Sequence, residues 1–96
     1  MYYQYGKKQK QKAMKTLKDL RSKLVSKKAG SEYVYRINNT RYEICEFNDN
    51  KGWCLNEYRE HKRYGQELVD SYGYEGLLLR DCKDMILLAW NNNEIK

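Results

Sequence analysis

The chain has 96 residues, of which 41% are hydrophobic and 33% charged, and its formal net charge at pH 7 is +6. A chain of this length builds one small domain with a modest core, which excludes a multidomain architecture. Three cysteines without a C-x-x-C pair, and the absence of an apolar leader or a run of about 20 apolar residues, favour a reduced, cytoplasmic protein.

The charge is divided unevenly along the chain. Ten cationic side chains lie between Lys7 and Lys28 against the single acid Asp19, so this segment carries +9 while the other residues sum to −3. Such asymmetry indicates an anionic partner for one part of the chain. We therefore expect the basic segment to make the main contact.

Residues 1–10 are expected to be a flexible tail rich in tyrosine and lysine, ahead of a single α+β domain over 11–96. The tail offers no Ser, Thr, Asp or Asn as a helix N-cap, and its cations oppose the helix macrodipole. Tyr2, Tyr3 and Tyr5 precede the lysines, and aromatic rings among cations can stack on unpaired bases. A disordered start without a role explains the same residues equally well.

Residues 11–28 are predicted to form a basic amphipathic helix. Ala13, Leu17, Leu20 and Leu24 recur at helical spacing and form one narrow apolar stripe. This stripe is suited to docking on the rest of the domain, and pairing with a second copy leaves a homodimer open. The lysines expected to carry the electrostatics of binding are Lys8, Lys12, Lys15, Lys18, Lys23 and Lys27.

After Gly30 the hydrophobic pattern changes to alternation, which predicts an antiparallel meander of three or four strands over residues 33–72. A register with Ile44 opposite Leu55 gathers apolar side chains on one face of the second and third strands. The same register sets Cys45 opposite Cys54 on the reverse face. The expected strands are 33–37, 41–47 and 53–59, with 67–72 undecided.

The last element is a predicted helix over residues 78–91 that packs on the sheet. Its core side is expected to consist of Leu79, Cys82, Met85, Ile86 and Ala89. The predicted fold class is therefore α+β, with an N-terminal basic amphipathic helix, a three- to four-stranded antiparallel β-meander and this C-terminal helix. The order of the strands in the sheet is left open.

Catalytic chemistry has little support in the sequence. His61 is the only histidine, and the separated cysteines give no metal-ligand spacing. Acids that could bind a divalent ion are more often simply solvated: they are Glu57, Glu60, Glu67 and Asp70. We expect no enzyme, metal or cofactor, and a metal-dependent hydrolase using Glu57 and His61 is kept as a third hypothesis.

The first functional hypothesis is a small non-enzymatic basic protein that binds nucleic acid or a ribonucleoprotein through its Lys-rich helix. Lysine contacts phosphate as a point charge without the bidentate fork of arginine, so we expect binding that does not read base sequence. A solvated helix face would show the same charges without any partner. The helix lacks the Trp or Phe anchors of a membrane-surface helix, so no membrane contact is expected.

In broad organisation, the Tyr- and Lys-rich start followed by a compact α+β domain resembles small phage-encoded proteins, including some anti-CRISPR inhibitors. The resemblance implies an alternative function: a phage or mobile-element accessory protein that binds and blocks a host nucleic-acid-processing enzyme. Discrimination between partners would then come from the aromatic residues Tyr35, Trp53 and Tyr58.

Overall fold

The computed structural model describes residues 14–28, 31–47 and 51–96. The predicted tail, including Tyr2, Tyr3, Tyr5 and Lys8, lies outside the described residues, as does Lys12. The elements are α2 (Leu17–Arg21), β1 (Leu24–Lys28), β2 (Glu32–Ile37), β3 (Thr40–Phe47), β4 (Gly52–His61), β5 (Gly65–Glu75) and α3 (Leu79–Asn91). The α+β class, the antiparallel sheet and the C-terminal helix agree with the prediction.

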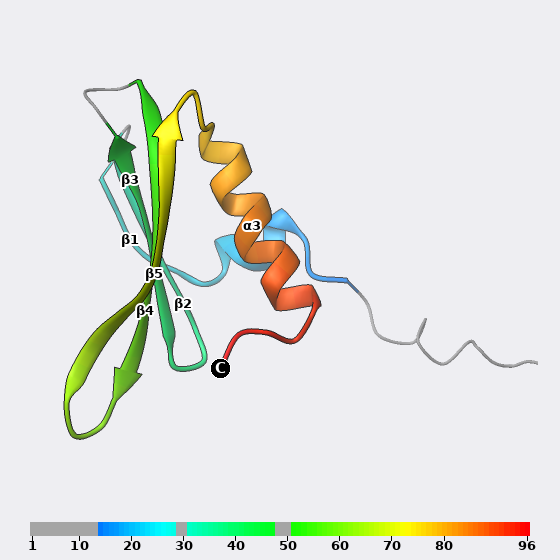
Figure 1. Ribbon diagram of the computed structural model, residues 1–96. Helices are drawn as coiled ribbons and strands as arrows, with labels where there is room; N and C mark the ends of the chain where they lie inside the picture. The colour runs from blue at the N-terminus through cyan, green and yellow to red at the C-terminus, as the bar shows by residue number, and fades with distance from the viewer. Residues whose placement is uncertain (1–13, 29–30, 48–50) are drawn as a thin grey trace, which may run out of the picture.

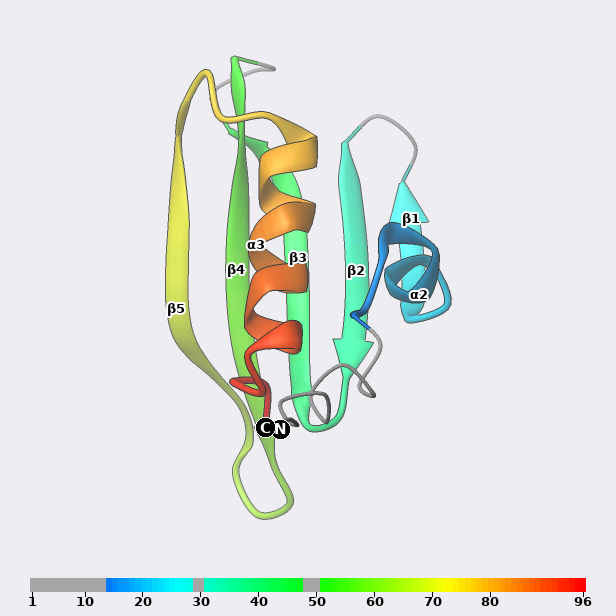
Figure 2. The same cartoon turned by 90° about the vertical axis from the view of Figure 1, so that its right-hand side faces the viewer.

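The five strands form one antiparallel meander in the order β1-β2-β3-β4-β5, so β1 and β5 are its edges. Both helices lie on the same face of the sheet (Figure 1). Seen from that face, α3 runs along the middle strands and packs on β3 and β4, while α2 lies over β1 (Figure 2). No helix of the described ranges covers the reverse face.

The predicted basic helix over 11–28 is wrong in its extent. Helix α2 has only five residues, and Leu24–Lys28 form an edge strand instead. A capping box starts the helix: the Thr16 N–H donates to Asp19 Oδ2 at 2.8 Å, and the Asp19 N–H donates to Thr16 Oγ1 at 3.5 Å. Ser22 is the C-cap of the helix, and its hydroxyl donates to the Asp19 carbonyl at 2.6 Å.

The leucine spacing misled the prediction because two different elements satisfy it. Leu20 of α2 is 1% exposed and belongs to the core, and Leu24 of β1 packs against the same core. Leu17, by contrast, is 47% exposed, so no continuous stripe exists. Pairing with β2 supplies β1 with sheet hydrogen bonds, which outweighs the helical pattern of its side chains.

The sheet also has more strands than the predicted three or four. One addition is β1, and the undecided stretch after His61 is the full-length strand β5. The predicted register between the second and third strands of the meander is confirmed, because Ile44 pairs with Leu55 and Cys45 pairs with Cys54. Strand number was therefore mispredicted at the edges, while the centre of the sheet was predicted correctly.

The core lies between the sheet and α3. Ile44 of β3 and Ile86 of α3 are both fully buried, and the other predicted core positions of α3 are buried or pack against this cluster. The C-terminus closes one end of the core, because Ile95 is buried and Thr40 Oγ1 donates to the Lys96 carbonyl at 3.1 Å. Within the described residues, no helix has the length and apolar character needed to cross a membrane.

Candidate functional site

The predicted binding lysines that the structure describes lie around α2. Lys15 precedes the helix, Lys18 lies on it, Lys23 follows it and Lys27 lies in β1, and all four are exposed. We define the basic surface as these lysines together with two further cations beside them, Arg21 of α2 and Lys83 of α3. The basic surface thus joins three elements and is not one helix face.

One side of the basic surface is built on Trp90, near the end of α3. The ammonium group of Lys15 lies 5.1 Å from the Trp90 ring centroid, and that of Lys23 lies 6.0 Å from it. Both distances are within the range of cation–π attraction. The half-buried indole therefore holds two cations from opposite ends of α2 near one another.

The other side of the basic surface borders a pocket of about 240 Å³. We call it the basic pocket; its lining residues are Leu17, Leu20, Arg21, Leu24, Lys27, Tyr33, Tyr35 and Lys83. Three cations and two tyrosines meet there without any acid. The ammonium group of Lys83 lies 5.3 Å from the Tyr33 ring centroid, which keeps this cation beside the pocket.

The cations of the basic surface form no ion pair with the acids of the described residues. The ion pairs formed there use Arg36, Arg41, Arg59 and His61 instead. Asp19, the acid closest in sequence, accepts hydrogen bonds from Thr16, which are the main cause of its lowered pKa, and the charges of Lys15 and Lys18 lower that pKa further. Asp19 therefore offsets part of the charge of Lys15 and Lys18, and the other cations around α2 remain available to an anion.

The two cysteines on the reverse face do not form a reactive site. Cys45 and Cys54 oppose one another across β3 and β4, and all three cysteines are free. The Cys54 thiol donates to Asn56 Oδ1 at 3.5 Å. Burial raises the pKa of the Cys45 thiol, with a further rise caused by Cys54, so the nucleophilic thiolate is disfavoured at neutral pH.

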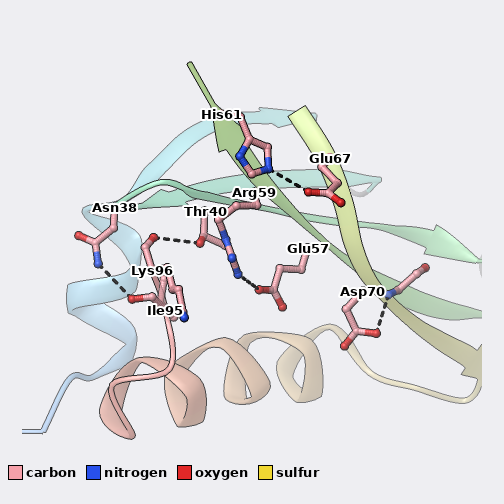
Figure 3. Close-up of polar contacts among 10 residues, drawn as sticks. Asn38, Thr40, Glu57, Arg59, His61, Glu67, Asp70, Ile95 and Lys96 are labelled. Carbon is pink, nitrogen blue, oxygen red and sulfur yellow. Dashed lines mark hydrogen bonds and ion pairs between the residues drawn. The ribbon is translucent and has the colours of Figure 1, made fainter. Parts of the chain in front are cut away.

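Of the acids considered as metal ligands, Glu57 and Asp70 oppose one another in the register of β4 and β5, while Figure 3 shows Glu57 paired with Arg59 and Glu67 paired with His61. Glu57 Oε2 pairs with Arg59 at 3.3 Å, and Glu67 Oε1 lies 2.9 Å from Nε2 of His61. Glu60 points to the face of the sheet opposite to that of Glu57, because successive side chains of β4 alternate between the two faces. The described part of the chain holds no group of three or more His, Cys, Asp or Glu residues that could bind a metal ion.

A Cys–His catalytic pair is also absent from the described residues. Cys54 and His61 lie on the same strand, seven positions apart, and therefore on opposite faces of β4. Seven residues of a strand span about 23 Å, far beyond hydrogen-bond reach. Cys45 lies beside Cys54 at that distant end, and Cys82 is fully buried in the core.

The aromatic residues predicted for partner discrimination do not share a surface. Tyr35 is buried and faces the helices, while Tyr58 alternates to the reverse face of the sheet. Sequence reasoning also missed Tyr33 and Lys83 as neighbours of the basic segment. Tyr33 falls within a predicted strand and Lys83 within the predicted C-terminal helix, and their approach depends on how α3 packs on the sheet.

The fold and this site define a small α+β protein with a five-stranded meander and a basic surface whose cations form no ion pair within the described residues. Comparison of the chain with protein-family models, with curated proteins and with solved structures finds no match.

Proposed function

We propose that this protein binds nucleic acid, alone or within a ribonucleoprotein, and does so without catalysing a reaction. The observation that carries the proposal is the basic surface around α2, whose cations form no ion pair with an acid in the described ranges. Exposed cations gathered on one surface neutralise phosphates and release condensed counterions. Five of the six cations are lysines, which favours contact with the phosphate backbone over base reading.

The proposal is tested by the salt dependence of binding. A labelled duplex and a single strand of the same sequence are titrated with the full chain over roughly 50 to 200 mM salt, followed by fluorescence anisotropy. If about four phosphates of a duplex are contacted, the logarithm of affinity falls against the logarithm of salt with a slope of about −3.6. A binding affinity that does not change with salt over this range contradicts the proposal.

A matched pair of triple variants separates the basic surface from net charge alone. Lys15→Ala, Lys18→Ala and Lys23→Ala together remove three charges from that surface. Their control removes three exposed lysines from other parts of the chain: Lys51, Lys62 and Lys96, each to Ala. The first variant should weaken binding and flatten the salt slope by two to three, by roughly one per lost phosphate contact, whereas the control should retain the slope. Equal losses would place binding elsewhere.

The alternative, a protein that blocks a host nucleic-acid-processing enzyme, has one observation in its favour. Edge strand β5 exposes several apolar side chains: Leu68, Val69, Tyr72 and Tyr74 are each 41–54% exposed. An exposed apolar edge is a template for pairing with a strand of another protein. A partner retained from nuclease-treated lysate, and lost from the Leu68→Asp variant, supports this alternative. A partner that disappears with the nucleic acid supports the first proposal.

A further inference from the structure

The basic pocket differs from the rest of the basic surface because it is concave and lined by aromatic and aliphatic groups. Arg21, Lys27 and Lys83 come from α2, β1 and α3, and they converge on a space of about 240 Å³. Sites for drug-sized ligands have volumes of about 300–1,000 Å³, so this pocket suits a smaller unit. Its cationic rim selects an anionic group, and arginine can grip that group with two parallel hydrogen bonds.

Tyr35 adds a polar group to the lining of the pocket. Its side chain lines the pocket although the residue is only 4% exposed, and Arg21, another lining residue, acts electrostatically on its hydroxyl. Burial is the main cause of the raised pKa of Tyr35, so the hydroxyl keeps its proton at neutral pH and is a donor.

The walls of the pocket indicate what the anionic group is attached to. Tyr33 contributes an aromatic ring, and Leu17 and Leu24 contribute aliphatic surface. A nucleobase is flat and can lie against an aromatic ring or an aliphatic side chain, with an energy of about 1–3 kcal/mol for stacking on an aromatic ring. A phosphate joined to a flat ring therefore fits both halves of the lining.

We propose that the basic pocket binds one nucleotide unit. Its phosphate would accept hydrogen bonds from Tyr35 and Arg21, with Lys27 and Lys83 adding charge, and its base would lie against Tyr33. This inference rests on the proposed nucleic-acid binding and extends it, because only an unstacked base can enter the pocket. Single strands and strand ends are therefore preferred to a continuous duplex.

The experiment measures the binding of adenosine 5′-monophosphate, adenosine and inorganic phosphate to the full chain by isothermal titration calorimetry. The monophosphate should bind at least about tenfold more tightly than adenosine, because the phosphate makes the charge-assisted hydrogen bonds. It should also bind more tightly than inorganic phosphate, which lacks the base. A monophosphate that binds no better than adenosine overturns the proposal.

A matched pair of variants isolates the hydroxyl. Tyr35→Phe removes only the oxygen in the pocket, and Tyr42→Phe removes the oxygen of an equally buried tyrosine on β3 that does not line the pocket. Tyr35→Phe should weaken monophosphate binding about tenfold, while Tyr42→Phe leaves it unchanged. Equal effects of the two variants refute the assignment, and thermal unfolding checks that both remain folded.

Two further measurements distinguish a failure of this inference from a failure of the proposed function on which it rests. Competition of the monophosphate with a labelled single strand shows that a strand occupies the pocket; binding without competition identifies a free nucleotide as the occupant. If the single strand binds with the expected salt slope while Tyr35→Phe has no effect, the pocket assignment fails and the proposed function stands. If the monophosphate binds and no strand does, the proposed function fails and the pocket assignment stands.

Discussion

Asn91 binds the backbone of Lys15 in both directions. Its Oδ1 accepts from the Lys15 N–H at 2.6 Å, and its Nδ2 donates to the Lys15 carbonyl at 3.2 Å. The two residues are 76 positions apart, so this side chain joins the residues just before α2 to the end of α3. Because Lys15 and Lys23 flank Trp90 one residue away, the same contact positions one side of the basic surface.

Asn91→Ala should loosen the segment before α2 without unfolding the sheet. Both hydrogen bonds are exposed, so the free energy of unfolding should fall by only about 1 kcal/mol. Amide hydrogen exchange followed by mass spectrometry should instead show clearly faster exchange in residues 14–23. The neighbouring Asn92→Ala is the control, because the Asn92 side chain is exposed. Identical exchange in both variants would contradict the role of Asn91.

Ile86, at the contact of α3 with the sheet, should contribute strongly to stability. It is fully buried, so Ile86→Ala leaves a cavity and should lower the free energy of unfolding by about 2–5 kcal/mol. Leu88 lies on the same helix but is 64% exposed, and Leu88→Ala should change stability by less than about 0.5 kcal/mol. Urea denaturation monitored by circular dichroism measures both values. Comparable losses would show that α3 packs through a different face.

The centre of the fold was predictable because several local signals agreed there. Alternation of apolar residues and the turn at Asn38 and Asn39 gave β2 and β3, and the burial of Ile44 with Leu55 required one register of β3 with β4. Asn38 has a φ of 57°, which asparagine tolerates better than most residues. A one-residue slip would have turned Ile44 to the reverse face.

The edge strands of the sheet were less predictable, because their side chains do not indicate which strand their backbone pairs with. The segment after Ser22 carries leucine at helical spacing and lysines that suit either a helix or an exposed strand. The capping box of Thr16 and Asp19 was readable from the sequence, and it would have moved the helix start to Leu17. The basic pocket could not be read in this way, since it needs α2, β1, β2 and α3 to meet.

Gly73 should be intolerant of a side chain because β4 and β5 approach closely at this position. A Cβ atom added there would lie 2.9 Å from Cβ of Cys54, the residue opposite it in the register. Gly73→Ala should therefore lower the free energy of unfolding by about 1–3 kcal/mol. In a Cys54→Gly background the same substitution should cost less, although part of the cost remains because Cα of residue 54 and the Trp53 carbonyl oxygen would each still lie 3.0 Å from the added Cβ. A double-mutant cycle measures the difference by urea denaturation. A cycle with no coupling would exclude this contact as the cause.

Stability should fall at alkaline pH because Cys82 is held protonated in the core. Burial is the main cause that raises the pKa of this thiol from 9.0 to about 11. Between these two pH values the unfolded chain loses the proton and the folded chain keeps it. The folded state then binds more protons, so the free energy of unfolding decreases as pH rises, by up to about 2–3 kcal/mol for this group.

Urea unfolding of the wild-type chain and of Cys82→Ala, measured from about pH 8 to pH 11, provides the comparison. Cys82→Ala should be less stable at about pH 8 because it leaves a small cavity, but its stability should decline less steeply above about pH 9. The remaining slope in the variant comes from other groups whose pKa is raised by burial, including Cys45 and Tyr35. Parallel curves for the two proteins would show that Cys82 ionises as readily in the folded state as in the unfolded chain.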